Sequence, residues 1–141
     1  MSNREDFILN IIDVLKDMRD PKPILVTREP FEPTKLAITQ FPAILVQSGN
    51  ETRDDNSMGV FRQGLITYTI RGFVRGPETD RKRNDLIERI EETLDTDRKR
   101  GTNRSDVTTN VIEVNVVPRL EPLGEIEMLV QVRYRYQKGV N

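Results

Sequence analysis

The chain of 141 residues contains no cysteine, no histidine and no tryptophan. Without cysteine it can form neither a disulfide nor a thiolate metal site, and the lack of histidine nearly excludes zinc and copper chemistry as well. The missing histidine also removes the usual proton shuttle near neutral pH. These absences argue against an enzyme, and we expect no catalytic residue, no metal site and no cofactor.

An excess of charge of one sign is also missing, because 22 Lys and Arg residues are balanced by 23 Asp and Glu residues. The net charge of −1 gives no reason to expect specific nucleic-acid recognition or a membrane partner. The apolar runs are only a few residues long and the N-terminal segment is rich in charge, so we expect neither a membrane span nor a signal peptide. The expected place of synthesis is a cytoplasm, from which lysis could release the protein.

The positive charge is unevenly divided, since the chain has 16 arginines and 6 lysines. The planar guanidinium suits bidentate pairing with carboxylates across protein interfaces, so this excess favours a protein that assembles with others. A genome with arginine-rich codons explains the excess equally well.

Apolar and polar residues alternate over two long segments, 64–76 and 124–139. In the first segment Ile66, Tyr68 and Ile70 alternate with threonines and Arg71, and in the second Val130, Val132, Tyr134 and Tyr136 alternate with polar residues. A period of two predicts strands with one buried and one polar face. Since neither polar face has the composition of a reaction centre, the sheet is expected to serve as a surface.

The other elements follow from apolar spacing and from proline and glycine breaks. We predict helices over residues 4–19 and 80–97, strands over 24–28, 41–47, 60–75 and 107–117, a fifth strand after the turn at 119–124, and a mobile loop over 48–59. Ile112, Val114 and Val116 are expected to be buried in the fourth strand. The prediction is one α+β domain over residues 1–141, with a mostly antiparallel sheet of about five strands flanked by two helices, in the order α-β-β-β-α-β-β.

Five residues on the polar faces of the long strands are candidates for contact with a copy of this chain or another partner: Arg71, Phe73, Arg75, Arg133 and Arg135. Aromatic residues grouped with arginine are enriched at interfaces. A solvated sheet face is the competing interpretation. The basic clusters 81–83 and 98–100 could form a phosphate site, but nearby acidic residues neutralise them and no aromatic residue is interleaved for base stacking.

Five segments together resemble the tail terminator proteins of long-tailed bacteriophages, also described as tail completion or minor tail proteins. The resemblance covers nearly the whole chain and is carried by residues 41–49, 68–76, 84–91, 121–124 and 130–136. It implies an α/β subunit that forms a hexameric ring at the head-proximal end of the tail in the virion, after assembly in the host cytoplasm. The implied partners are the ring neighbours, the tail tube protein, the neck or connector protein and, in contractile tails, the last sheath ring.

The resemblance implies no catalytic residues, which agrees with the composition. Two other functions stay open. A phage neck or head-tail connector protein has a similar size and also forms rings. A small-ligand-binding or enzymatic α+β domain is a less favoured alternative, which a deep pocket with convergent polar groups would support.

Overall fold

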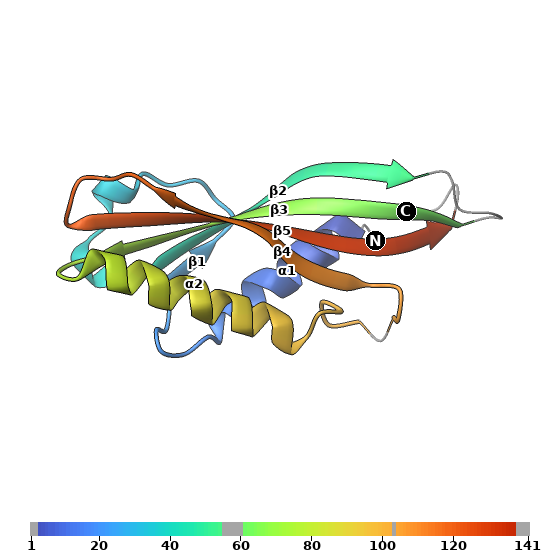
Figure 1. The fold of residues 1–141 in the computed structure, drawn as a ribbon, viewed down its shortest axis with the longest axis horizontal. Helices are drawn as coiled ribbons and strands as arrows, with labels where there is room; N and C mark the ends of the chain where they lie inside the picture. The colour runs from blue at the N-terminus through green and yellow to red at the C-terminus, as the bar shows by residue number, and fades with distance from the viewer. Residues whose placement is uncertain (1–2, 55–60, 103, 138–141) are drawn as a thin grey trace.

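The structure is a computed structural model that describes residues 3–54, 61–102 and 104–137. The helices and strands follow one another in the predicted order (Figure 1). They are α1 (Asn3–Lys16), β1 (Leu25–Thr27), β2 (Ala43–Asp54), β3 (Phe61–Arg75), α2 (Thr79–Thr96), β4 (Thr108–Val117) and β5 (Leu123–Gln137). Two short 3-10 helices, η1 (Pro33–Lys35) and η2 (Ile38–Gln40), lie between β1 and β2.

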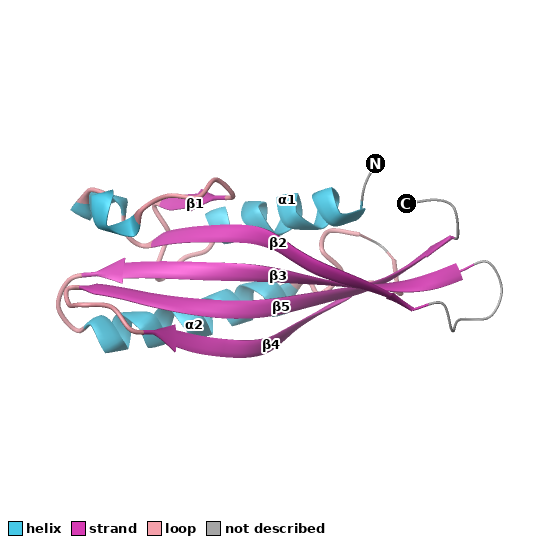
Figure 2. Cartoon of the chain, turned by 90° about the horizontal axis from the view of Figure 1, so that it is seen from above, coloured by secondary structure: helices cyan, strands magenta, loops and turns pink. Residues whose placement is uncertain are grey.

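The strands form a single sheet in the spatial order β1-β2-β3-β5-β4 (Figure 2). The short strand β1 runs parallel to β2, and every other neighbouring pair is antiparallel. Strands β4 and β5 are adjacent and antiparallel, as expected for a hairpin. The predicted α+β class with a mostly antiparallel sheet is therefore confirmed.

Both helices lie on the same face of the sheet (Figure 1). Helix α1 buries Phe7, Ile8, Ile11, Ile12 and Leu15, and α2 buries Leu86, Ile90 and Leu94. These side chains pack on the apolar residues of the long strands, among them Ile70, Met128, Val130 and Val132. Burial of this face supplies the main hydrophobic stabilisation of the subunit, at about 25 cal/mol for each Å² of apolar surface.

Close packing of α2 on the sheet depends on Gly72 in β3. A Cβ at this position would lie 2.7 Å from Leu86 Cδ2 and 3.0 Å from Ile126 Cγ1. A larger residue would push the helix away from the strands, so this glycine serves helix packing.

Within the described part of the chain, residues 28–42 between β1 and β2 cover one end of the opposite face of the sheet and leave the rest of that face open (Figure 1). There Ala43, Leu45 and Phe73 form a second, smaller buried cluster. It is completed by partly buried residues, namely Leu25, Phe31, Leu36 and Phe41. We call this cluster the minor core.

The prediction of a mobile loop over 48–59 is wrong for its first part, because β2 continues to Asp54. Pairing with β3 is interrupted by a bulge after Ser48 and resumes at Glu51, which lies opposite Ile66. The sequence of this stretch is polar and does not predict a strand, because the strand is stabilised by partners in β3 and α1 that are distant in the sequence. Residues 55–60 lie outside the described part of the chain.

The prediction that Ile112, Val114 and Val116 are buried is also wrong, because they are 49%, 40% and 53% exposed. Val114 and Val116 lie opposite Met128 and Ile126 of β5, so they do point to the helix side of the sheet. They remain exposed because β4 is the last strand of the sheet and no described strand lies on its outer side.

Candidate interaction surface

Phe73, a predicted contact residue, lies within the subunit and not on its surface. Its side chain is only 1% exposed, and its ring meets the ring of Phe31 edge to face at a centroid distance of 5.3 Å. The prediction that Phe73 shares a face with Arg71 and Arg75 is right, but residues 28–42 cover this end of the face. Phe73 therefore supports the minor core and is not available for direct contact with a partner.

Arg71 is held by a buried carboxylate next to the minor core. Glu125, whose side chain is 1% exposed, accepts hydrogen bonds from Nε and Nη2 of Arg71 at 2.9 and 2.7 Å. Its other oxygen accepts from Nε of Arg119 at 2.7 Å. The Arg71 guanidinium also lies 5.4 Å from the centroid of the Phe73 ring. Since two cations neutralise one buried anion, this cluster fixes the β4–β5 turn to the sheet.

Arg75 lies half-buried at the end of β3, where it lines two separate hollows. Its backbone oxygen accepts a hydrogen bond from Nζ of Lys82 in α2 at 3.1 Å. Arg75 lies ten residues along β3 from Leu65, the residue that pairs with Arg133 of β5. The five candidates therefore do not form one patch.

Arg133 and Arg135 are exposed on β5, as their position in the alternation predicts. Arg133 lies between Leu65 of β3 and Thr108 of β4. The backbone nitrogen of Arg135 donates to Asp106 at 2.8 Å, which ties this part of β5 to the loop before β4.

The residues around Arg133 belong to a part of the sheet that neither helix nor the 28–42 segment covers. None of them is buried, and they occupy neighbouring rows on β3 and β5 opposite the helix side. We call this surface the open face: Leu65, Thr67, Thr69, Leu129, Gln131 and Arg133. With one charge among six side chains, it is a mixed polar and apolar surface of the kind found at non-obligate interfaces.

A second buried carboxylate, which the sequence did not suggest, is Glu51 on the helix side of the sheet. Its side chain is 7% exposed and accepts hydrogen bonds from Tyr134 Oη at 2.5 Å, Arg53 Nε at 2.9 Å and Arg4 Nη1 at 3.1 Å. Burial alone raises the pKa of the Glu51 carboxyl. The hydrogen bonds from Tyr134, Arg4 and Arg53 outweigh burial, so its pKa lies below the ordinary value.

The Glu51 cluster joins α1 to β2 and β5. Arg4 also donates through Nη2 to the backbone oxygen of Gly49 at 2.9 Å, and Tyr68 Oη donates to the backbone oxygen of Arg4 at 3.0 Å. Burial raises the pKa of Tyr68 and of Tyr134, which keeps both phenols protonated as donors. In the sequence, the cluster is indicated only by Glu51 and Arg53, two residues apart in a segment that otherwise resembles a loop. Such a pair is too common to identify a buried cluster.

The basic clusters that could have formed a phosphate site are used within the subunit. Arg100 is buried and donates to the backbone oxygens of Leu94, at 2.6 Å, and Asp97, at the end of α2. Burial lowers the pKa of the Arg100 guanidinium, and the nearby carboxylate of Asp97 opposes this effect. A cation at this end of a helix is favoured by the helix dipole. Arg98 likewise donates to the backbone oxygen of Thr109 at 3.0 Å.

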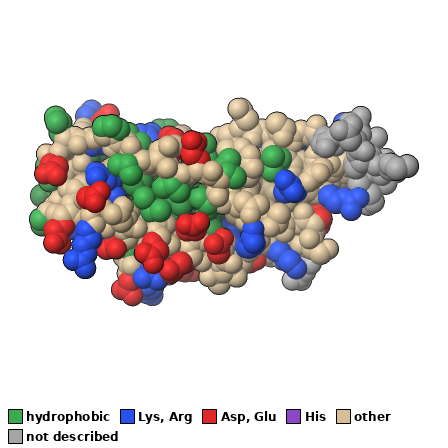
Figure 3. Space-filling model, in the orientation of Figure 1, with side chains coloured by type: hydrophobic (Ala, Val, Ile, Leu, Met, Phe, Trp, Pro, Cys, Tyr) green, Lys and Arg blue, Asp and Glu red, His purple; other side chains and the backbone are tan. Residues whose placement is uncertain are grey.

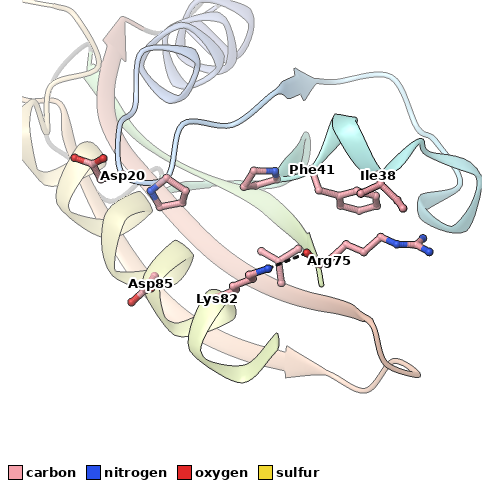
Figure 4. A pocket seen from close by; sticks show the side chains of 9 residues that line it. Asp20, Ile38, Phe41, Arg75, Lys82 and Asp85 are labelled. Carbon is pink, nitrogen blue, oxygen red and sulfur yellow. Dashed lines mark hydrogen bonds between the residues drawn. The ribbon is translucent and has the colours of Figure 1, made fainter. Parts of the chain in front are cut away.

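A hollow of about 410 Å³ lies beside the first half of α2 (Figure 4). Its walls combine apolar and charged residues, namely Asp20, Pro21, Ile38, Phe41, Pro42, Val74, Arg75, Lys82 and Asp85. Figure 4 shows Asp20 and Asp85 at one end and the Arg75 guanidinium at the other, while Lys82 turns to the backbone of Arg75. The polar groups do not converge on one point, so the hollow lacks the arrangement expected of a ligand site.

Among the described residues, no three Asp or Glu side chains come together in a way that could hold a metal ion. In the same part of the chain, neither helix has the length and apolar character required to cross a bilayer. Comparison of the chain with protein-family models and with curated proteins gave no match.

Proposed function

We propose that this chain is a structural subunit that forms a ring on the head-proximal end of a phage tail tube and stops its growth. The observation that carries the proposal is the open face, a part of the sheet that the helices and loops described in the structure leave uncovered. A subunit that works by contact needs such a surface and needs no reactive side chains. The fold also has the sheet and helices that the resemblance to tail terminators implies.

The mechanism of termination in this proposal is steric. Six copies meet head to tail, which gives two different contact surfaces on each subunit and a closed ring. One side of the ring reproduces the contact that another ring of tube protein would make. The other side lacks this contact, so polymerisation ends there and the neck or connector protein can bind, together with the last sheath ring in a contractile tail.

Arg133 and Arg135 are the residues on which we expect this contact to depend. They are exposed on β5 and lie at and beside the open face. A guanidinium can pair with a carboxylate of a neighbour in bidentate geometry, and such pairs gain strength when the interface excludes water. Arg71 and Phe73 act indirectly in this proposal, because they hold the covered end of the same face in place. Arg75 lies half-buried at the end of β3, and its backbone is bonded to Lys82 of α2.

Counting and locating the protein on purified phage particles tests the proposal. Quantitative mass spectrometry should give six copies for each tail, and a fusion tag visible by electron microscopy should lie where the tail meets the head. Twelve copies, or a position on the head side of the joint, would favour a neck or connector protein. Absence of the protein from particles would overturn both functions and would favour a ligand-binding function at the hollow beside α2.

A further inference from the structure

Strand β4 (Thr108–Val117) is the last strand of the sheet, and among the described residues no strand pairs with its outer edge. It carries a bulge after Val111, and Arg98 donates to the backbone oxygen of Thr109 near its start, so the unprotected part of the edge runs from Glu113 to Val117. The strand contains no proline and no positive charge, and Glu113 is its only charged residue. Natural sheets usually protect such an edge with lysine, proline, a bulge or a covering segment, because it can pair with another strand. The large apolar side chains exposed on β4 are Ile112, Val114 and Val116, beside the exposed polar residues Asn110 and Glu113.

Figure 3 is a view onto this edge and shows hydrophobic side chains gathered over β4, above the acidic surface of α2. Apart from Glu113 and two asparagines, the strand consists of β-branched residues, which favour extended pairing. The exposed apolar row and the free edge therefore lie in the same place.

The other edge of the sheet is protected. Strand β1 pairs with β2 along Ala43–Leu45 only, but beyond it the bulge after Ser48 interrupts the strand. There the Arg4 guanidinium donates a hydrogen bond to the backbone oxygen of Gly49, and the charged residue Arg53 lies further along the strand. If β4 of one copy paired with β2 of the next, the exposed apolar residues of β4 would lie against this charged and polar edge.

The β4 sequence is complementary to itself. In an antiparallel pair centred on Val114, Val114 meets its own copy, and Ile112, the extra residue of the β4 bulge, comes next to Val116. Glu113 then lies opposite Asn115, so no like charges face each other directly. A pair centred one residue earlier would oppose two Glu113 carboxylates, which is unfavourable.

We propose that the free subunit forms a two-fold dimer in which β4 pairs with β4 of a second copy, centred on Val114. The contact joins two five-stranded sheets into one continuous sheet and covers the exposed valines. The dimer concerns the β4 edge of the free subunit and does not rest on the proposed function, which concerns the open face.

The mass of the purified full chain in solution is the first test. Light scattering should give twice the 16.3 kDa of one chain at micromolar concentration. Val114→Lys should raise the dissociation constant at least tenfold and give a monomer of unchanged circular dichroism. The matched control is Glu113→Lys, which changes the charge more but faces away from the apolar row and should stay dimeric. A monomeric parent chain, or equal effects of the two variants, would overturn the proposal.

Crosslinking of a single cysteine tests the two-fold register, and the natural chain has no cysteine to confuse the result. Val114→Cys treated with a short bismaleimide should give a covalent dimer in high yield, because residue 114 meets its own copy. Gln47→Cys, on β2, should give little dimer. If Val114→Cys crosslinks only in the double variant with Gln47→Cys, the edges meet head to tail and the two-fold pairing is wrong.

Discussion

The two faces of the sheet are built from the same strands but are closed to different extents. On the helix side, α1 and α2 bury an unbroken set of side chains that includes Val132. On the other side the described residues cover only the end near Phe73, and Arg133, the next residue after Val132, is exposed. The difference places the larger core on one face and leaves part of the other face without cover from the described residues.

The largest effect is expected from a charge placed on the closed face. Val132→Asp would bury a carboxylate without a partner and should reduce the free energy of unfolding by about 4 kcal/mol or more, a large share of the stability of a small domain. Chemical denaturation followed by circular dichroism measures this. Arg133→Asp is the matched control, since it places the same side chain one residue away on the open face and should change the stability by less than about 0.5 kcal/mol. Similar losses in the two variants would contradict the assignment of the faces.

A smaller loss is expected at the covered end of the second face. Replacing Arg71 and Arg119 together by methionine leaves the Glu125 carboxylate buried without its two cations. The arginines are themselves partly exposed, so water can reach the site in part and we expect a loss of about 2–4 kcal/mol. Adding Glu125→Gln to the double variant should recover much of the stability. If the triple variant is no more stable than the double one, the stranded charge is not the cause.

The Glu51 cluster should give a loss that depends on pH. Glu51→Gln keeps the shape but removes the charge that Arg4 and Arg53 bind, and should cost about 1–3 kcal/mol at pH 7. Because the folded-state pKa of Glu51 is lowered, its contribution is fully present above the unfolded-state pKa of about 4.3 and disappears as the pH falls through the folded-state pKa. The difference in unfolding free energy between the parent and Glu51→Gln should therefore be constant above about pH 5.5 and shrink below about pH 4. A difference that stays constant down to pH 2.5 would contradict this account.

The smallest effect on stability is expected on the open side. Changing Arg133 and Arg135 together to glutamate alters two exposed side chains and should change the free energy of unfolding by less than about 0.5–1 kcal/mol. Thermal unfolding of the purified variant measures this. A loss comparable to that of Val132→Asp would mean that these arginines stabilise the subunit itself.

The sequence was sufficient where an element's own residues decide the outcome. The alternation in β3 and β5 predicted which side chains face the helices. It was insufficient where the outcome depends on a neighbour. The exposure of Val114 follows from the position of β4 at the edge of the sheet, and the burial of Phe73 follows from Phe31 in a distant, proline-rich segment.

The Glu51 cluster is a further case of dependence on distant residues. Its donors come from α1, β2 and β5, with 83 positions separating Tyr134 from Glu51 along the chain. A polar stretch with such partners has the composition of a loop, and only the fold reveals that it is a strand.

The most direct test of the central claim, that the open face is an assembly surface, is the length and head attachment of tails made with the variant in which Arg133 and Arg135 are changed to glutamate. Loss of a charge partner in a buried interface costs roughly 2–5 kcal/mol, and a ring repeats this loss at every contact. We predict a soluble, folded subunit together with tails of uncontrolled length, or tails that do not join heads, when electron micrographs are measured. Tails of normal length joined to heads would show that this face is only solvated and would contradict the account.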